Sequence, residues 1–331
     1  MTILAVGGEA ECFVEVVDND FAIESGVGRF DSTLSRHAMK ITQAVSEIDL
    51  IFPGGAVDEA WIHMYVYQED VEEEVDWIRF VDGSSNTLYV ITMESDGAWT
   101  LRKNNSGFSD LATSDDPVVV NEAAIIDIYI KRHASTGEFT VYKDGEVVVT
   151  FTGDTETSAS AFDRIRWSGL VGSDKELNLS QVIVADETTI GMKLATLAPS
   201  SNGTYSAWIG DYTDVAQENL DTGVGIETPD VDDVSSFQLS NIHSSHNNSV
   251  VVSYIIAMLG LIEDDADDTE DFQIVTRVGS TDYLSDDLGF TSSDVLERIQ
   301  KAINDNPATS NPWTVQQLNS AEFGVKAIYE A

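Results

Sequence analysis

The stretch Phe139-Thr-Val-Tyr-Lys-Asp-Gly-Glu-Val-Val-Val-Thr-Phe151 predicts a β-hairpin. Asp144 and Gly145 separate two runs of β-branched and aromatic residues, which favour strands. An Asp-Gly pair readily adopts the two positive φ angles of a type I′ turn, and this turn matches the twist of antiparallel strands. The stretch therefore predicts an antiparallel sheet.

Similar short runs extend over most of the first 185 residues. In residues 126–131 the alternation places Ile126, Ile128 and Ile130 on one face, which we expect to be core, and polar residues on the other. Strand-like runs separated by Gly, Asn, Asp and Ser are typical of an antiparallel sandwich or barrel. Further runs lie at residues 61–67, 77–80, 88–91, 147–151 and 165–167.

Part of this pattern resembles a known fold. Asp127-Ile-Tyr-Ile-Lys, the hairpin from Gly137 and Phe162-Asp-Arg-Ile-Arg-Trp-Ser-Gly169 are similar to laminin-G and concanavalin A-like jelly-roll domains. The resemblance covers residues 1–187 and implies a lectin-like sandwich. Residues 188–331, where long polar loops separate the strand-like runs, predict a second, smaller β-sandwich.

Two helices are predicted in this second domain. Ser292 or Ser293 can cap a helix in which Val295, Ile299 and Ile303 recur on one face, before Asn304-Asp-Asn-Pro307 ends it.

A shorter helix begins at Thr314, because Gln317 occupies the capping-box position and Gly324 follows as a stop. Residues 325–329 then predict the last strand.

The short helix belongs to a stretch with a second resemblance. Asn306-Pro-Ala-Thr-Ser-Asn-Pro-Trp-Thr-Val-Gln-Gln-Leu-Asn-Ser-Ala-Glu-Phe-Gly-Val325 resembles the closing segment of structural proteins from tailed-virus particles. We expect Trp313, Leu318 and Phe323 to pin this segment to the sandwich. The resemblance implies a virion protein assembled in the host cytoplasm, either a tail-fibre or receptor-binding component or a capsid-surface decoration. Its partners would be copies of itself, as a trimer in a fibre, other virion proteins and a host-surface glycan.

The composition is strongly acidic. Among 331 residues, 58 acidic side chains face 17 basic ones, for a formal net charge of -41. Such a surface repels nucleic acid and anionic lipid, and it suits a saline habitat in which ions screen self-repulsion. The longest apolar run, residues 250–262, is too short to span a membrane as a helix. Cys12 is the single cysteine, so an intrachain disulfide is excluded.

Candidate catalytic carboxylates occur in Glu47-Ile-Asp-Leu50. In concanavalin A-like glycoside hydrolases one strand carries Glu, Asp and Glu at alternate positions; here Glu47 and Asp49 match, but Ile51 and Phe52 stand where a third carboxylate is needed. We therefore predict that the protein is not an enzyme. The alternative is a carbohydrate-binding or glycan-hydrolysing protein that uses the jelly roll.

Metal ligands are weakly indicated, and we predict no cofactor. The acidic runs at residues 263–271 and 230–233 offer oxygen ligands of the kind calcium prefers, but neither has the glycine and terminal glutamate of a helix-loop-helix calcium loop. Calcium stays an alternative there. His243 and His246 lie in a Ser- and Asn-rich segment that predicts a polar turn.

Tryptophans could supply a platform for a sugar ring or an oligomer contact. Trp99 follows the Asp96-Gly97 turn and Trp208 lies between Ser206 and Gly210, so these two are the surface candidates. Trp61 and Trp167 continue alternating strands, and we expect them to pack in the core.

Overall fold

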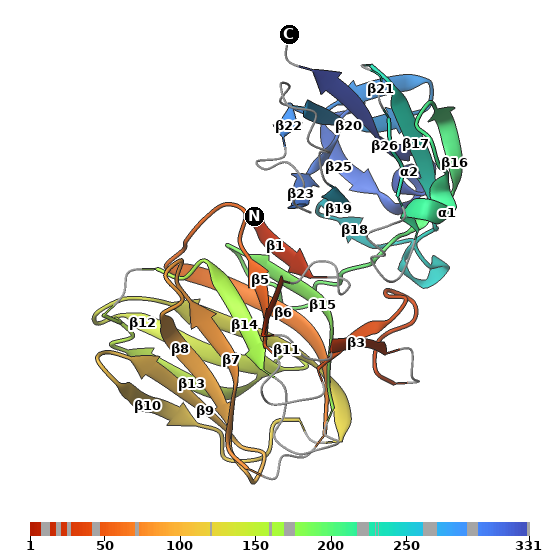
Figure 1. Cartoon of the computed structure of the whole chain (residues 1–331). Coiled ribbons are helices and arrows are strands. Elements are labelled where there is room, and N and C mark those ends of the chain that lie inside the picture. The colour runs from red at the N-terminus through yellow and green to blue at the C-terminus, as the bar shows by residue number, and fades with distance from the viewer. Residues whose placement is uncertain are drawn as a thin grey trace. The chain divides into compact units, whose positions relative to one another are not determined.

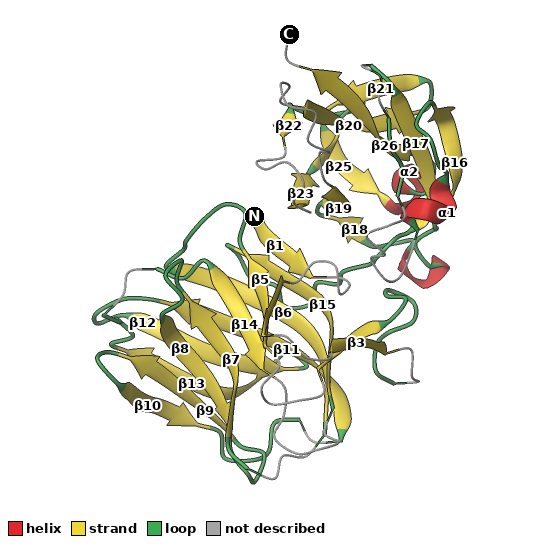
Figure 2. Ribbon diagram, viewed as in Figure 1, coloured by secondary structure: helices red, strands yellow, loops and turns green. Residues whose placement is uncertain are grey.

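A computed structural model describes residues 1–7, 14–17, 21–24, 28–41, 47–69, 73–119, 121–158, 161–168, 176–216, 225–228, 230, 232–260, 270–289 and 297–329. The chain divides into two compact units, Met1–Thr196 and Leu197–Ala331 (Figure 1). Strands dominate both units and the helices are short (Figure 2). The prediction of a mainly β protein with a jelly-roll-type sandwich, a smaller β-sandwich and short helices is confirmed.

The first unit is a sandwich of two antiparallel sheets. The eight-stranded sheet runs in the order β13-β12-β11-β6-β15-β4-β3, with β1 also paired to β15. Its strands are β1 (Ile3–Gly7), β3 (Phe21–Glu24), β4 (Ala38–Ile41), β6 (Glu59–Gln68), β11 (Glu122–Lys131), β12 (Gly137–Lys143), β13 (Glu146–Gly153) and β15 (Leu177–Ala185).

The seven-stranded sheet runs in the order β10-β9-β8-β7-β14-β5-β2. Its strands are β2 (Val14–Val17), β5 (Glu47–Ile51), β7 (Val75–Val81), β8 (Thr87–Met93), β9 (Trp99–Asn104), β10 (Phe108–Thr113) and β14 (Arg164–Ser168).

Between the sheets lies one continuous apolar core. Phe80 of β7 meets Phe139 of β12 edge to face, with ring centroids 5.7 Å apart, so the aromatic rings join the two layers. Ile126, Ile128 and Ile130 are fully buried, as the alternation predicts. The inward-facing residues of both sheets fill this core. The alternate residues of each strand therefore face outward, and each sheet has one outer face.

The hairpin at residues 139–151 forms as predicted. Lys143 pairs with Glu146 across the turn, and Asp144 and Gly145 have φ angles of 51° and 85°. Both values are positive, as a type I′ turn requires. The turn therefore sets the register of β12 against β13.

The end of the first unit lies beyond residue 187, where we expected the boundary. Thr189 donates a hydrogen bond to Asp127, and the backbone N–H of Thr196 donates to the carbonyl of Leu34. These contacts attach residues 188–196 to the first unit, whose limit is Thr196.

The second unit is built on a six-stranded sheet in the order β16-β17-β26-β20-β21, with β22 also paired to β20. Its strands are β16 (Pro199–Ser206), β17 (Val234–Leu239), β20 (Glu270–Val278), β21 (Thr281–Leu284), β22 (Leu288–Gly289) and β26 (Glu322–Tyr329). Smaller sheets and turns complete it: β18 (Val250–Val251), β24 (Asp305–Asn306), β25 (Asn311–Thr314), β19 (Tyr254–Gly260), β23 (Glu297–Ile303), α1 (Tyr212–Val215), η2 (Ser244–His246) and α2 (Val315–Leu318).

The closing segment packs as the sequence predicts, but α2 ends at Leu318, and Gly324, the expected stop, lies inside β26, which begins at Glu322. The Thr314 side chain accepts from the Gln317 backbone N–H, and the Gln317 side chain accepts in return, which completes a capping box at α2. Trp313, Leu318 and Phe323 are buried together in the core of this unit. The segment therefore packs its buried side chains with Phe323 of β26, a central strand of the six-stranded sheet.

The longer predicted helix is wrong. Residues 297–303 form strand β23, which pairs along its length with β19, from Tyr254 opposite Ile303 to Gly260 opposite Glu297. Pairing with an apolar strand distant in sequence satisfies the backbone of this segment and outweighs its helical periodicity. Residues 291–296, which include the expected cap, lie outside the described residues.

Two other predictions concern membranes and cysteine. Within the described ranges, no helix is both long and apolar enough to cross a membrane. Most of the apolar run at residues 250–262 forms β18 and β19 instead of a helix. Cys12 lies outside the described residues.

Candidate functional site

An exposed group of aromatic rings lies on the outer face of the eight-stranded sheet. In β6 the residues Ala60, Ile62, Met64 and Val66 are fully buried, so the alternate residues face outward. Trp61 lies directly opposite Tyr129 of β11, and Tyr142 of β12 lies one strand further and one row along. Strand alternation therefore brings three aromatic side chains from three adjacent strands together.

The three rings stack. Trp61 and Tyr129 have centroids 4.7 Å apart with planes inclined by 24°, and Trp61 and Tyr142 have centroids 5.7 Å apart with planes inclined by 26°. All three residues are partly exposed. We call Trp61, Tyr129 and Tyr142 the aromatic platform. It offers apolar ring surface to a ligand on an otherwise acidic protein.

Charged side chains border the platform on one side. Glu59, Lys131 and Glu138 occupy neighbouring strands in the next row of outward positions. The Tyr129 hydroxyl donates to Glu59 Oε1 at 2.6 Å, and Lys131 Nζ lies 3.6 Å from Glu59 Oε2. Partial burial raises the pKa of Tyr129, and the bond to Glu59 raises it further. Tyr129 therefore stays a neutral donor to Glu59 at neutral pH.

A buried polar cluster supports the opposite side. His63 Nδ1 lies 3.0 Å from Asp127 Oδ1, and the Thr189 hydroxyl donates to the same oxygen at 2.7 Å. None of the three residues is more than 1% exposed. Thr189 thus covers the pair and ties the chain after β15 to this face.

Apolar residues extend the platform toward the hairpin. Val147 lies opposite Tyr142 in the register and is 54% exposed. Ile190 is 40% exposed and approaches the turn at Gly145. These side chains add exposed apolar surface on the hairpin side of the rings.

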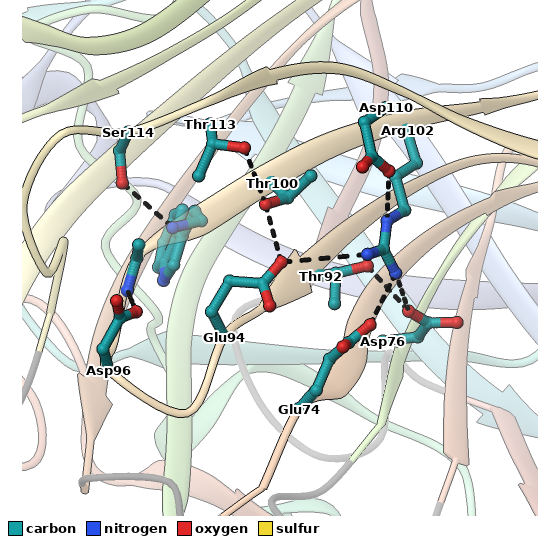
Figure 3. A network of polar contacts seen from close by, with 12 residues as sticks. Glu74, Asp76, Thr92, Glu94, Asp96, Thr100, Arg102, Asp110, Thr113 and Ser114 are labelled. Carbon is teal, nitrogen blue, oxygen red and sulfur yellow. Dashed lines mark hydrogen bonds and ion pairs between the residues drawn. The ribbon is translucent and has the colours of Figure 1, made fainter.

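The outer face of the seven-stranded sheet has a different character. It carries Arg79, Arg102, Arg164 and Arg166, and we call it the arginine face. Arg102 is its hub (Figure 3): Nε donates to Asp110 at 2.8 Å and Nη1 to Glu74 at 2.7 Å. Glu94 and Asp76 lie 3.8 and 3.9 Å from the guanidinium. One cation thus organises four carboxylates.

The two predicted carboxylates also lie on the arginine face. Arg166 binds Asp49 through two hydrogen bonds of 2.7 and 2.9 Å and Glu47 at 3.2 Å, and Arg79 contacts Glu47 as well. Asp49 is only 2% exposed. Ile51, the next outward residue of β5, is 41% exposed, so no carboxylate stands at that alternate position. Glu47 and Asp49 are therefore engaged as partners of arginines.

The expectations for the tryptophans of the first unit are partly reversed. Trp99 is fully buried and packs against Trp77 with ring centroids 4.8 Å apart, so it is unavailable to a ligand. It lies opposite Met93 at an inward position of β9, whereas Arg102 lies at an outward one. Trp61, expected in the core, is partly exposed on the platform instead. Trp167 is fully buried, as expected.

Trp208 of the second unit keeps some exposure. Its indole N–H donates to the carbonyl of Asp233 at 3.1 Å, and the adjacent Ile209 is 60% exposed. Trp208 thus remains a surface aromatic, fixed by one hydrogen bond.

The sequence carries a signal for the aromatic platform. Within Trp61-Ile-His-Met-Tyr-Val-Tyr67 the aliphatic residues occupy every second position, and the aromatic residues and His63 occupy the others. Aliphatic side chains prefer full burial more than Trp or Tyr does, so this alternation indicates an outward aromatic row.

Metal ligands are not gathered in the described part of the chain, where no group of three or more His, Asp, Glu or Cys side chains could hold an ion. The acidic run at 263–271 falls mostly outside the described residues. In the other run, Asp232 pairs with Lys326 at 2.7 Å and Asp233 accepts from Thr228. His243 and His246 flank a short turn with ring centroids 6.4 Å apart.

The comparisons with known proteins leave the family open. No protein-family model matches the chain, and no curated protein matches it. Among solved structures, it is similar to an endo-β-1,4-glucuronan lyase from the fungus Trichoderma reesei, with 15% identity, a TM-score of 0.44 and coverage of 54% of this chain and 93% of the lyase.

Two further similarities are weaker. An alginate lyase from Chlorella virus has 10% identity and a TM-score of 0.38, covering 51% of this chain and 89% of the lyase. The receptor-binding domain of botulinum neurotoxin type G has 9% identity and a TM-score of 0.37, covering 91% of this chain and 65% of that domain. Similarities this low assign neither a family nor an activity to the chain.

Proposed function

We propose that the protein is a non-enzymatic carbohydrate-binding protein that holds a sugar ring on the aromatic platform. The observation that carries the proposal is the partly exposed stack of Trp61, Tyr129 and Tyr142 beside Glu59 and Glu138. A pyranose ring has an apolar C–H face that packs on aromatic rings, while carboxylates accept hydrogen bonds from its hydroxyls. The platform provides both kinds of contact within adjacent strands.

The rigidity of the site supports binding. The three aromatic residues lie on paired strands, and the cluster of His63, Asp127 and Thr189 anchors the neighbouring row. Side chains fixed before the ligand arrives lose little conformational entropy on binding.

The proposal that the protein is not an enzyme rests on the arginine face. A glycoside hydrolase needs one carboxyl group that donates a proton and a second that acts as nucleophile or base. Glu47 and Asp49 are both bound by Arg166, which leaves neither carboxylate available for these roles.

Binding is tested by presenting the full chain to a glycan array and measuring the affinity of each hit by calorimetry. We expect at least one oligosaccharide to bind, and Trp61→Ala to remove most of that binding. The matched control is Phe108→Ala, because Phe108 is 52% exposed but lies on the seven-stranded sheet. An array without hits, or equal losses in the two variants, would refute the proposal.

Catalysis is tested in parallel with the same oligosaccharides and with polysaccharides. We expect no release of reducing sugar or of unsaturated product. Release that is lost in Glu47→Gln would show that the protein is an enzyme.

A virion role is a second proposal, and it rests on the closing segment. Residues 306–325 resemble the end of tailed-virus structural proteins, and four of their side chains, Trp313, Leu318, Ala321 and Phe323, are buried together in the core of the second unit. In this proposal the chain assembles with copies of itself and with other particle proteins, at the tail or on the head. Immunogold labelling of purified particles tests it, and absence of the protein from such particles would refute it.

A further inference from the structure

The carboxylates around the aromatic platform exceed the cations placed among them. In the outward rows, Glu59 and Glu138 flank Lys131 in one row, and Asp127 lies in the row on the other side of Tyr129. Asp127 is buried and paired with His63, so the accessible carboxylates beside the rings are Glu59 and Glu138, with Lys131 as the cation of their row. The local charge favours a positively charged ligand.

Glu138 is the carboxylate beside the platform that has no ion-pair partner among the described residues. Its Oε1 accepts from the Thr140 hydroxyl at 2.9 Å. Glu59, in contrast, contacts both Lys131 and the Tyr129 hydroxyl. An oxygen of Glu138 is thus held in the row next to the rings, and Lys131, which lies opposite Glu138 in the register, pairs with Glu59 instead.

The rings themselves attract positive charge. The faces of tryptophan and tyrosine bear partial negative charge and stabilise an ammonium group placed near them. The Tyr129 phenol donates to Glu59, which adds negative charge to its side of the stack. Ring faces and carboxylates therefore both favour a positively charged ligand.

We infer that the aromatic platform selects amino sugars that carry a protonated amine, such as β-1,4-linked glucosamine units. The sugar ring packs on Trp61 and the ammonium group meets Glu138. This inference rests on the proposed glycan binding at the same site. Uronic acids are repelled by the same carboxylates, and neutral sugars make the ring contact and the hydroxyl hydrogen bonds without the ion pair.

The test uses the full chain and three matched β-1,4-linked hexamers, of glucosamine, N-acetylglucosamine and glucose. Tryptophan fluorescence or calorimetry gives each affinity at low salt. We expect the glucosamine hexamer to bind about tenfold more tightly than the glucose hexamer, a size that combines a cation–π contact with an ion pair. Added salt should reduce this ratio.

Two variants separate a local effect from the net charge. Glu138→Gln should lower the glucosamine-to-glucose ratio about threefold to tenfold, because the amide loses the ion pair with the ammonium group but keeps an oxygen that can bond a hydroxyl of either hexamer. Glu73→Gln removes one exposed carboxylate next to the seven-stranded sheet and should leave the ratio unchanged. Equal effects of the two variants would overturn the inference, because the preference would then reflect only the overall charge of -41.

The remaining outcomes distinguish this inference from the proposed function. Equal, Trp61-dependent binding of glucose and glucosamine hexamers would overturn the amino-sugar preference and retain glycan binding. Glucosamine binding that is unaffected by Trp61→Ala would also overturn the inference, since the platform would not be the site. If no hexamer binds and the glycan array is empty, both proposals fail.

Discussion

On the arginine face, Arg102 lies within 3.9 Å of four carboxylates, and Arg166 binds Glu47 and Asp49. On the opposite outer face of the same sandwich, Glu138 accepts a hydrogen bond from the Thr140 hydroxyl and forms no ion pair among the described residues, in the row next to the stacked rings. Each of these carboxylates on the first face lies next to an arginine, whereas on the second face Glu138 has no ion pair in the described part of the chain and the aromatic rings are partly exposed. In our proposal the arginine face serves stability and the platform serves binding.

The largest expected effect concerns the stability of the arginine face. Arg102→Gln leaves Glu74, Asp76, Glu94 and Asp110 close together without their shared cation, and we expect it to lower the free energy of unfolding by about 2 kcal/mol. Urea unfolding at low salt measures this loss. The control is Lys143→Gln, which breaks the single pair with Glu122 and should cost less than about 1 kcal/mol. If both variants lose a similar free energy of unfolding, the network around Arg102 stabilises the protein no more than a single surface ion pair does.

The next effect concerns the platform. Trp61→Ala should weaken glycan binding by about tenfold, equivalent to about 1.4 kcal/mol. Its effect on unfolding should be smaller than that of Arg102→Gln, because the Trp61 ring is partly exposed. Calorimetry and urea unfolding of the same variant separate the two quantities. A large loss of stability together with unchanged affinity would reverse our assignment of the two faces.

A third prediction concerns one end of the eight-stranded sheet, where a carboxylate is paired with two cations. There Glu176 lies 3.0 Å from Arg29, whose guanidinium lies over Tyr67, and it also contacts Lys40. Partial burial opposes ionisation of Glu176, but Lys40 and Arg29 outweigh it, so the net effect is a lowered pKa. Since the folded pKa is below the unfolded one, the stabilisation exists above the unfolded pKa and is lost as the pH falls through the folded pKa.

Glu176→Gln should therefore lower the free energy of unfolding by about 1 kcal/mol at pH 7. The difference in this free energy between the variant and the unmodified protein should become smaller below about pH 4.3. Urea unfolding between neutral and acidic pH measures it, and Lys40→Gln should give a similar loss at pH 7. A difference independent of pH would show that Glu176 acts through packing instead of charge.

The smallest expected effect is the response of the whole protein to salt. Because the net charge is -41, moderate salt should raise the melting temperature by a few degrees through screening. Arg102→Gln should respond more strongly to salt than the unmodified protein, since its carboxylates lack their cation. Melting temperatures that are equal in low and molar salt would contradict both statements.

Local sequence was sufficient for several elements. The Asp144-Gly145 turn, the buried face of residues 126–131 and the capping box at Thr314 all formed as expected, because neighbouring residues fix each of them. The helix expected at residues 292–303 failed, because β19 supplies a strand partner from another part of the chain. The expectation that Trp99 lies at the surface failed for a related reason. The turn before Trp99 does not determine which face of β9 packs against the core.

The sequence by itself determined the strand-rich architecture, the hairpin turn and the acidic surface, because these follow from composition and from residues close together in the chain. Only the tertiary structure decided which aromatic residues stay exposed and which carboxylates meet a cation. Trp61, Tyr129 and Tyr142 become neighbours through the pairing of β6, β11 and β12, and Arg166 reaches Asp49 through the pairing of β14 with β5. Strand order and register set these contacts, and both depend on how the whole core packs.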